Sequence, residues 1–270
     1  MSTTLAPLPP GPVAGPGRLA RAVADGWTVT WRNLIAYTRI PQALVFSTVQ
    51  PIVLVLLFRY VFGGAIAGTP VPYEDFMLPG VFAQAISFGA VGTAVALADD
   101  MQKGLIERFR SLPMARSAVL VGRTSAELVR NVFVVALMTL VGFLVGFNYY
   151  AGLPAFLGGI LLLLLFGYAL SWTFTSVGLT AANAEVAQAK AFPILFPLIF
   201  ASSAFVPVDT MPGWLQGFAR NQPVSVIIDA ARALMIGGPT TEILLKALAW
   251  STVVLVAASA YGVHRYRKAL

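Results

Sequence analysis

Long apolar stretches separated by short polar connections run along most of the chain. They occupy residues 42–64, 76–98, 129–147, 153–179, 191–206 and 243–263. A helix needs about 20 mostly apolar residues to cross the ~30 Å hydrocarbon core of a bilayer. The pattern therefore predicts an all-α, polytopic membrane protein with six transmembrane helices.

The region before the first span has a different pattern. Residues 1–17 are rich in proline and glycine and lack the basic and apolar segments of a signal peptide, so we expect a flexible leader. Residues 18–40 follow a helical period with two distinct faces. The apolar face holds Leu19, Val23, Trp27, Trp31 and Leu34, and the polar face holds Arg21, Asp25, Thr28, Arg32 and Arg39. This predicts an amphipathic helix in the membrane interface; a short soluble helix packed on other protein is the alternative.

The composition and the distribution of charge support a membrane protein and indicate its orientation. Hydrophobic residues make up 58% of the chain and charged residues only 11%, compared with about 25% in a typical soluble domain. The net charge of +7 could indicate a nucleic-acid partner, but the basic residues lie between the apolar stretches, as topology signals do. A cytoplasmic N-terminus places 14 of the 18 basic residues in the cytoplasm. We therefore expect both termini to be cytoplasmic, and no nucleic acid to bind.

Several classes of protein chemistry are excluded by the residues that the chain lacks. It has no cysteine and a single histidine, His264, which argues against disulfides, metal sites and membrane enzymes with an acid–base constellation. An ion-coupled secondary transporter normally carries ionisable groups near mid-membrane. The acidic residues are expected at helix ends instead, namely Glu74, Asp75, Asp99, Asp100, Glu127, Glu185 and Glu242. Ion coupling is therefore the weaker alternative.

Two connections between spans have unusual compositions. Residues 99–127 are rich in mixed charges around a short amphipathic stretch that ends at Pro113, which predicts either a docking helix for a soluble partner or an ordinary solvated loop. Residues 205–241 are too apolar for a free outer loop, yet proline and glycine cut them into pieces too short to span a bilayer. We expect these residues to form a re-entrant hairpin of two short helices.

These two connections also carry a resemblance to a known family. The stretch FVPVDTMPGWLQ, residues 205–216, resembles the signature of ABC-2 type permeases, in particular the daunorubicin/doxorubicin resistance subgroup. The stretch KGLIERFRSLP, residues 103–113, is similar to the coupling loop of that subgroup. The similarity extends from about residue 18 to residue 267, which makes residues 18–270 resemble an ABC-2 type transmembrane domain.

The resemblance implies a permease subunit that forms a dimer with an identical or related copy and binds separate ATPase subunits from the cytoplasm. It implies drug efflux, and hence antibiotic resistance, in a bacterial plasma membrane. Contact with the ATPase is implied for Lys103, Gly104, Glu107, Arg108, Arg110, Leu112 and Pro113. The outer re-entrant helices are implied to be shaped by Phe205, Pro207, Met211, Pro212, Trp214, Asn221 and Pro223.

The source of energy is indicated by a motif that the chain lacks, and the cargo by polar and aromatic residues within the spans. No G-x-x-x-x-G-K-[ST] sequence occurs, so we expect ATP and magnesium to bind the partner subunit, with no cofactor on this chain. Polar and aromatic residues within the spans could line a path for a small hydrophobic substrate, although such residues more often pack helices together. They are Gln84, Ser87, Phe88, Ser202 and Ser203. We expect an apolar or amphipathic cargo, with a lipid, glycolipid or polysaccharide as the alternative.

Overall fold

The computed structural model describes residues 18–39, 41–64, 66, 69, 71–105 and 118–268, and all regular structure within them is helical. The helices are α1 (Arg18–Arg39), α2 (Pro41–Leu57), α3 (Tyr73–Gln102), α5 (Ala118–Val145), α6 (Leu153–Leu179), α7 (Ala184–Phe200), α8 (Gly213–Asn221), α9 (Pro223–Ile236) and α10 (Thr241–Lys268). A π-helical turn, Phe58–Phe62, extends α2, and a 3-10 turn, Val208–Thr210, precedes α8. The predicted all-α fold is confirmed.

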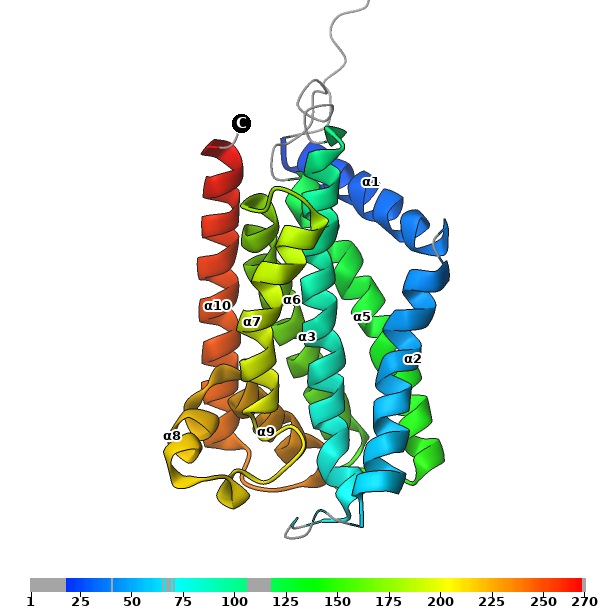
Figure 1. The fold of residues 1–270 in the computed structure, drawn as a ribbon, viewed down its shortest axis with the longest axis vertical. Coiled ribbons are helices and arrows are strands. Elements are labelled where there is room, and N and C mark those ends of the chain that lie inside the picture. The colour runs from blue at the N-terminus through cyan, green and yellow to red at the C-terminus, as the bar shows by residue number, and fades with distance from the viewer. Residues whose placement is uncertain are drawn as a thin grey trace, which may run out of the picture.

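The long helices form one bundle with two different ends (Figure 1). Helix α1 crosses one end, where α3 and α10 finish and α5 begins; we call it the α1 end. Helices α8 and α9 lie at the opposite end, which we call the α8 end. Helix α3 is central, because it packs against α2, α5, α6, α7 and α9.

Four helical segments are long and apolar enough to cross a bilayer. They are Tyr73–Gln102, Ala118–Val145, Leu153–Leu179 and Thr241–Tyr266. They confirm the polytopic character that the apolar stretches predict. Helices α2 and α7 have 17 residues each, shorter than a typical spanning helix, so the total of six spans stays a prediction.

Two helices have bounds that differ from the predicted spans. Helix α5 begins 11 residues before the expected 129, because its charged first turns find partners inside the protein. Helix α7 begins at Ala184, where the side chain of Asn183 accepts a hydrogen bond from the backbone N–H of Val186 at 2.8 Å. It ends at Phe200, and residues 201–206 form turns rather than the last part of a span.

One face of helix α1 packs against the protein, and the opposite face is exposed. Val29 and Asn33 are buried, and a Cβ at Gly122 would lie 2.6 Å from the Cβ of Val29, so α1 and α5 approach closely. Trp27 and Trp31 stack on the exposed face with their ring centroids 6.4 Å apart. Tryptophan side chains are enriched at the depth of the lipid headgroups. The exposed tryptophans thus fit the predicted interfacial helix.

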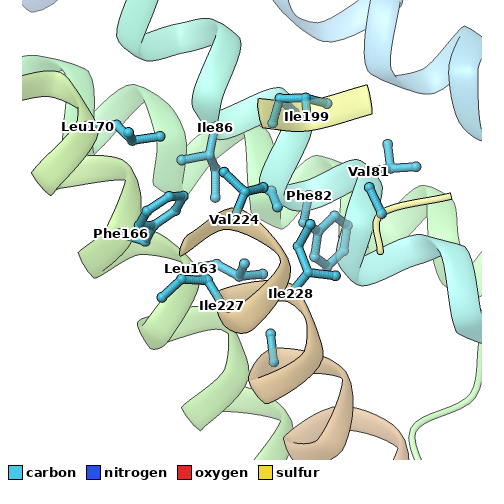
Figure 2. Packing of buried hydrophobic residues seen from close by; sticks show 14 of the residues in the cluster. Val81, Phe82, Ile86, Leu163, Phe166, Leu170, Ile199, Val224, Ile227 and Ile228 are labelled. Atoms are coloured by element: carbon cyan, nitrogen blue, oxygen red, sulfur yellow. The ribbon is translucent and has the colours of Figure 1, made fainter. Parts of the chain in front are cut away.

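Helix α9 enters the core from the α8 end. Its residues Val224, Ile227 and Ile228 pack against Phe82 and Ile86 of α3 (Figure 2). Gln222 satisfies the polar start of the helix by accepting a hydrogen bond from the Val224 N–H at 3.1 Å and donating one to the Leu198 carbonyl at 2.9 Å. A short helix inside an apolar core needs such partners for its unpaired backbone groups.

Arg232 fastens α9 to its neighbours. Its Nε donates a hydrogen bond to the Phe76 carbonyl at 3.1 Å, and its Nη2 donates one to the Ser203 carbonyl at 2.8 Å. The same guanidinium pairs with Asp229 at 2.6 Å and lies 3.8 Å from the centroid of the Phe76 ring. One side chain therefore joins α9 to α3 and to the turn that follows α7.

Labelling from the two sides of the membrane tests this arrangement. Lys103, just after α3, and Trp214, in α8, are exposed at opposite ends of the bundle. A membrane-impermeant maleimide added to intact cells should label a Trp214→Cys variant and spare a Lys103→Cys variant, and inverted vesicles should give the reverse result. The unsubstituted chain is the blank because it has no cysteine. Labelling of both variants from the same side would contradict the topology.

Candidate functional site

A cavity of about 630 Å³ lies between α1, α2, α3 and α5. One face of α3 forms its long wall through residues at three- and four-residue steps. They are Gln84, Phe88, Gly92, Ala96, Asp99 and Lys103. From Gln84 to Asp99 this stripe extends about 22 Å along the helix at 1.5 Å per residue, and Lys103 continues it just beyond the end of α3. The cavity therefore reaches from the α1 end into the apolar part of the bundle.

Charged side chains line the cavity at the α1 end and connect three helices there. Asp100 of α3 pairs with Arg32 of α1 at 3.3 Å and with Arg123 of α5 at 3.6 Å. The Oδ1 of Asn33 accepts hydrogen bonds from Arg32 at 3.1 Å and from Arg123 at 3.3 Å. Burial lowers the pKa of Arg32, against the opposing effect of Asp100. The network holds α1 against the ends of α3 and α5.

A buried ion pair lies deeper in the cavity wall. Glu127 is 2% exposed and Arg130 is 8% exposed. The Oε1 of Glu127 accepts hydrogen bonds from Arg130 Nε at 2.9 Å and from Nη2 at 2.5 Å, and its Oε2 accepts one from the Tyr37 hydroxyl at 3.0 Å. Burial, and then the charge of Glu127, raise the pKa of Tyr37, so its phenol remains a donor at neutral pH.

The wall of α3 is shaped to admit this pair. A Cβ at Gly89 would lie 1.7 Å from Arg130 Nη2 and 2.4 Å from Glu127 Oε1. Any side chain at this position would therefore force the Arg130 guanidinium and the Glu127 carboxylate to move from where they pair. Buried charges are stable only when they are paired and hydrogen-bonded, which Tyr37, Glu127 and Arg130 achieve together.

The expectation that the acidic residues all lie at helix ends is wrong for Glu127. This residue lies within α5, where Arg130 stands three positions later on the same helix face. The apolar pattern did not indicate the pair, because it places Glu127 in a cytoplasmic loop before a span beginning at residue 129. The i, i+3 spacing of opposite charges next to a long apolar run was the available signal.

The structure separates the residues predicted to line a substrate path. Gln84 and Phe88 line the cavity. Ser87 is buried and donates a hydrogen bond to the Ala83 carbonyl at 2.7 Å, as a residue that packs helices does. Ser202 and Ser203 lie in the turn after α7. The Ser202 hydroxyl donates a hydrogen bond to the Ile199 carbonyl at 2.5 Å, and the backbone N–H of Ser203 donates one to the Ser225 hydroxyl at 3.2 Å. The five residues therefore do not line one common cavity, and their role in transport stays a prediction.

Two of the predicted ATPase-contact residues can be placed. Lys103 follows α3 at the α1 end, and its ammonium donates a hydrogen bond to Asp99 at 2.7 Å, which raises the pKa of Lys103. Gly104 has a φ of +66°, a conformation that glycine adopts without strain. The other five lie outside the described residues, namely Glu107, Arg108, Arg110, Leu112 and Pro113.

The residues predicted to shape the outer helices all lie at the α8 end. Phe205 stacks on Phe58 with ring centroids 4.5 Å apart, and its carbonyl accepts a hydrogen bond from the Tyr73 hydroxyl at 3.1 Å. The others flank or form the short helical elements. Pro207 and Met211 flank the 3-10 turn, and Pro212 precedes α8. Trp214 is exposed on α8, Asn221 ends that helix, and Pro223 begins α9.

Breaking the buried ion pair should lower the stability of the protein. An Arg130→Met variant leaves the Glu127 carboxylate buried without its cation, so its free energy of unfolding in detergent should fall by about 3–5 kcal/mol. A Glu127→Gln, Arg130→Met double variant should recover part of this loss because neither charge remains. Lys246→Met, at an exposed pair, is the matched control and should change little. Equal losses in the single and double variants would contradict this account.

Comparison with known proteins identifies the family. A family model for ABC-2 type transporters matches residues 25–236, a range that covers the cavity and the outer helices. A daunorubicin resistance ABC transporter permease protein of Streptomyces coeruleorubidus is 37% identical over 222 residues, which are 82% of this chain and 78% of that protein. A probable doxorubicin resistance ABC transporter permease protein of Mycobacterium tuberculosis is 28% identical over 248 residues, or 92% of this chain and 90% of the relative. The chain therefore belongs to the ABC-2 type transporter family.

Proposed function

We propose that this chain is the permease subunit of an ATP-driven exporter that moves hydrophobic or amphipathic drugs out of a bacterial cell. The cavity between α1, α2, α3 and α5 carries the proposal, because its lining is largely apolar. Its charged groups lie toward the α1 end, except for Glu127 and Arg130, which lie deeper and pair with each other. Such a lining suits a molecule with an apolar body and polar substituents. The similarity to permeases named for daunorubicin and doxorubicin resistance supports the same class of cargo.

The energy for export enters from a separate ATPase subunit. The chain has no phosphate-binding G-x-x-x-x-G-K-[ST] sequence of its own. Residues 103–117 join α3 to α5, and those two helices also form two walls of the cavity. A push on this connection from the cytoplasm thus acts directly on the cavity walls, and binding of nucleotide to the partner shifts the permease between two conformations.

A second permease copy completes the transporter. Helix α7 presents Ile194, Phe196 and Phe200 on an exposed face, with the two phenylalanine rings stacked at a centroid distance of 4.4 Å. An identical or related copy covers this face within the plane of the plasma membrane. The α1 end faces the cytoplasm in this arrangement, and both chain termini lie there.

Export that depends on the residues between α3 and α5 tests the proposal. Inverted vesicles containing this chain and its cognate ATPase should take up doxorubicin when ATP is added, and vesicles lacking either polypeptide should not. A Glu107→Ala, Arg108→Ala double variant should reduce ATP-dependent uptake at least tenfold while the amount of protein in the membrane stays the same, because contact with the ATPase is lost.

The matched control removes another pair of oppositely charged residues. Glu242 and Lys246 form an exposed ion pair at the start of α10, at the α8 end. A Glu242→Ala, Lys246→Ala double variant should keep wild-type uptake. Wild-type uptake by the Glu107→Ala, Arg108→Ala variant would argue against coupling through residues 103–113.

A further inference from the structure

We propose that α8 is a membrane-anchoring helix that lies in the lipid–water interface at the α8 end, with the side chains of Trp214 and Phe218 inserted among the phospholipids. This binding needs neither the ATPase nor a cargo, so it goes beyond the proposed export function. The headgroup layer contains water, so α8 stays within reach of water-soluble reagents.

The exposed residues of α8 divide between an aromatic side and a charged side. Trp214 is 81% exposed and Phe218 is 47% exposed, and because they are four positions apart they project from the same side of the helix. Arg220 is exposed as well, but it follows Phe218 by two positions, about 200° around a helix of 3.6 residues per turn. Such a helix is typical of the membrane interface, where its apolar side enters the lipid.

The length of α8 indicates that its aromatic side has a partner. The helix has nine residues, and isolated helices shorter than about 12–15 residues are marginal in water. Within the described part of the chain it packs chiefly against α9 and the preceding 3-10 turn, and its buried residue is Ala219. Its N-cap residue is Pro212, which has no side-chain group to cap the helix. The aromatic side therefore needs a cover from outside these residues, and lipid supplies it.

Other aromatic side chains are exposed at the same end of the bundle. Tyr60 lies in the π-helical turn that extends α2, and Tyr149 and Tyr150 lie between α5 and α6. The backbone N–H of Tyr150 donates a hydrogen bond to the Met235 carbonyl of α9 at 3.1 Å, so this connection lies beside the helix that follows α8. Tyrosine and tryptophan are enriched at membrane–water interfaces. Three separate segments at the α8 end thus expose the side chains typical of this layer.

The distance between the two ends of the bundle matches the thickness of a bilayer. Val29, in the part of α1 that exposes two tryptophans, lies against Gly122 of α5. The Tyr149 ring lies 6.0 Å from that of Phe143, near the other end of α5. From Gly122 to Phe143 the helix rises about 32 Å at 1.5 Å per residue, and the hydrocarbon core of a bilayer is about 30 Å thick. The exposed aromatic residues of the two ends therefore lie at the two surfaces of one bilayer.

The charges beside α8 do not select an anionic lipid. Arg220 pairs with Asp209 of the 3-10 turn, and both side chains are exposed. Because the pair has no net charge, it adds no net attraction to negatively charged headgroups. Insertion of apolar side chains is therefore the source of binding, and we expect α8 to bind zwitterionic and anionic bilayers alike.

Fluorescent probes on opposite sides of α8 test this placement in the full chain. The chain has no cysteine, so Phe218→Cys and Arg220→Cys variants each carry one thiol for the fluorophore NBD. In phosphatidylcholine nanodiscs, a phospholipid with a nitroxide at carbon 5 of its acyl chain should quench the probe at position 218 at least threefold more than the probe at position 220. Iodide in the water should quench the probe at position 220 more strongly.

Three results would overturn the proposal. Equal quenching of both probes by the nitroxide lipid would mean that the aromatic side of α8 does not face lipid. Protection of the probe at position 218 from both quenchers would mean that protein, such as a second copy of the chain, covers this side. Quenching by the nitroxide lipid that requires added phosphatidylglycerol would mean that charge, and not apolar insertion, binds the helix.

Amide hydrogen exchange in nanodiscs gives a second measurement that needs no probe. A Trp214→Ser, Phe218→Ser double variant should exchange the amides of residues 213–221 at least tenfold faster than wild type, because α8 loses the contacts that stabilise it. A Gly213→Ser, Gly217→Ser double variant is the matched control, since a Cβ at either glycine has no heavy atom within 4 Å. Its α8 should exchange no faster than wild type, and α9 should keep the wild-type rate in both variants. Equal exchange of α8 in the two double variants would contradict anchoring through the aromatic side.

Discussion

The structure depends on one constraint: polar groups that enter an apolar interior must find partners within the chain. The Glu127 carboxylate meets it with Arg130 and Tyr37, which join α5 to α1. The guanidinium of Arg232 meets it with the carbonyls of Phe76 and Ser203, which join α9 to α3 and to the turn after α7. Each polar group thereby becomes a fixed connection between helices that apolar packing alone would leave free to slide.

The same constraint makes the two ends of the bundle different. At the α1 end, where α3 ends and α5 begins, ionic groups of α1, α3 and α5 pair around Asp100. At the α8 end, the short helices α8 and α9 close the bundle, and α9 reaches into the core through an apolar face and a capped start (Figure 2). An exporter needs such a difference, because energy enters at one side of the membrane and cargo leaves at the other.

The constraint is not fully met in the cavity wall, nor at several buried groups elsewhere, among them those of Thr93, Asn131 and Ser251. The charged groups of the wall pair with one another, but the amides of Gln84 and Asn33 each keep an unused atom. Gly89 and Gly92 contribute in opposite ways on the same face of α3: the first makes room for the Arg130 guanidinium, and the second leaves open space.

The sequence by itself determined the fold class and the family, because long apolar stretches dictate helices in a bilayer and the stretch at residues 205–216 has a local, recognisable pattern. It also indicated that α8 and α9 would be short, since proline and glycine interrupt a helix wherever they occur. Only the tertiary structure decided that Glu127 is buried, that Gln84 and Phe88 share a cavity while Ser202 and Ser203 do not, and that Arg232 joins three segments. The physical reason is that hydrophobicity and chain breaks act locally, whereas the partner of a polar group and the shape of a cavity depend on residues far apart in the chain.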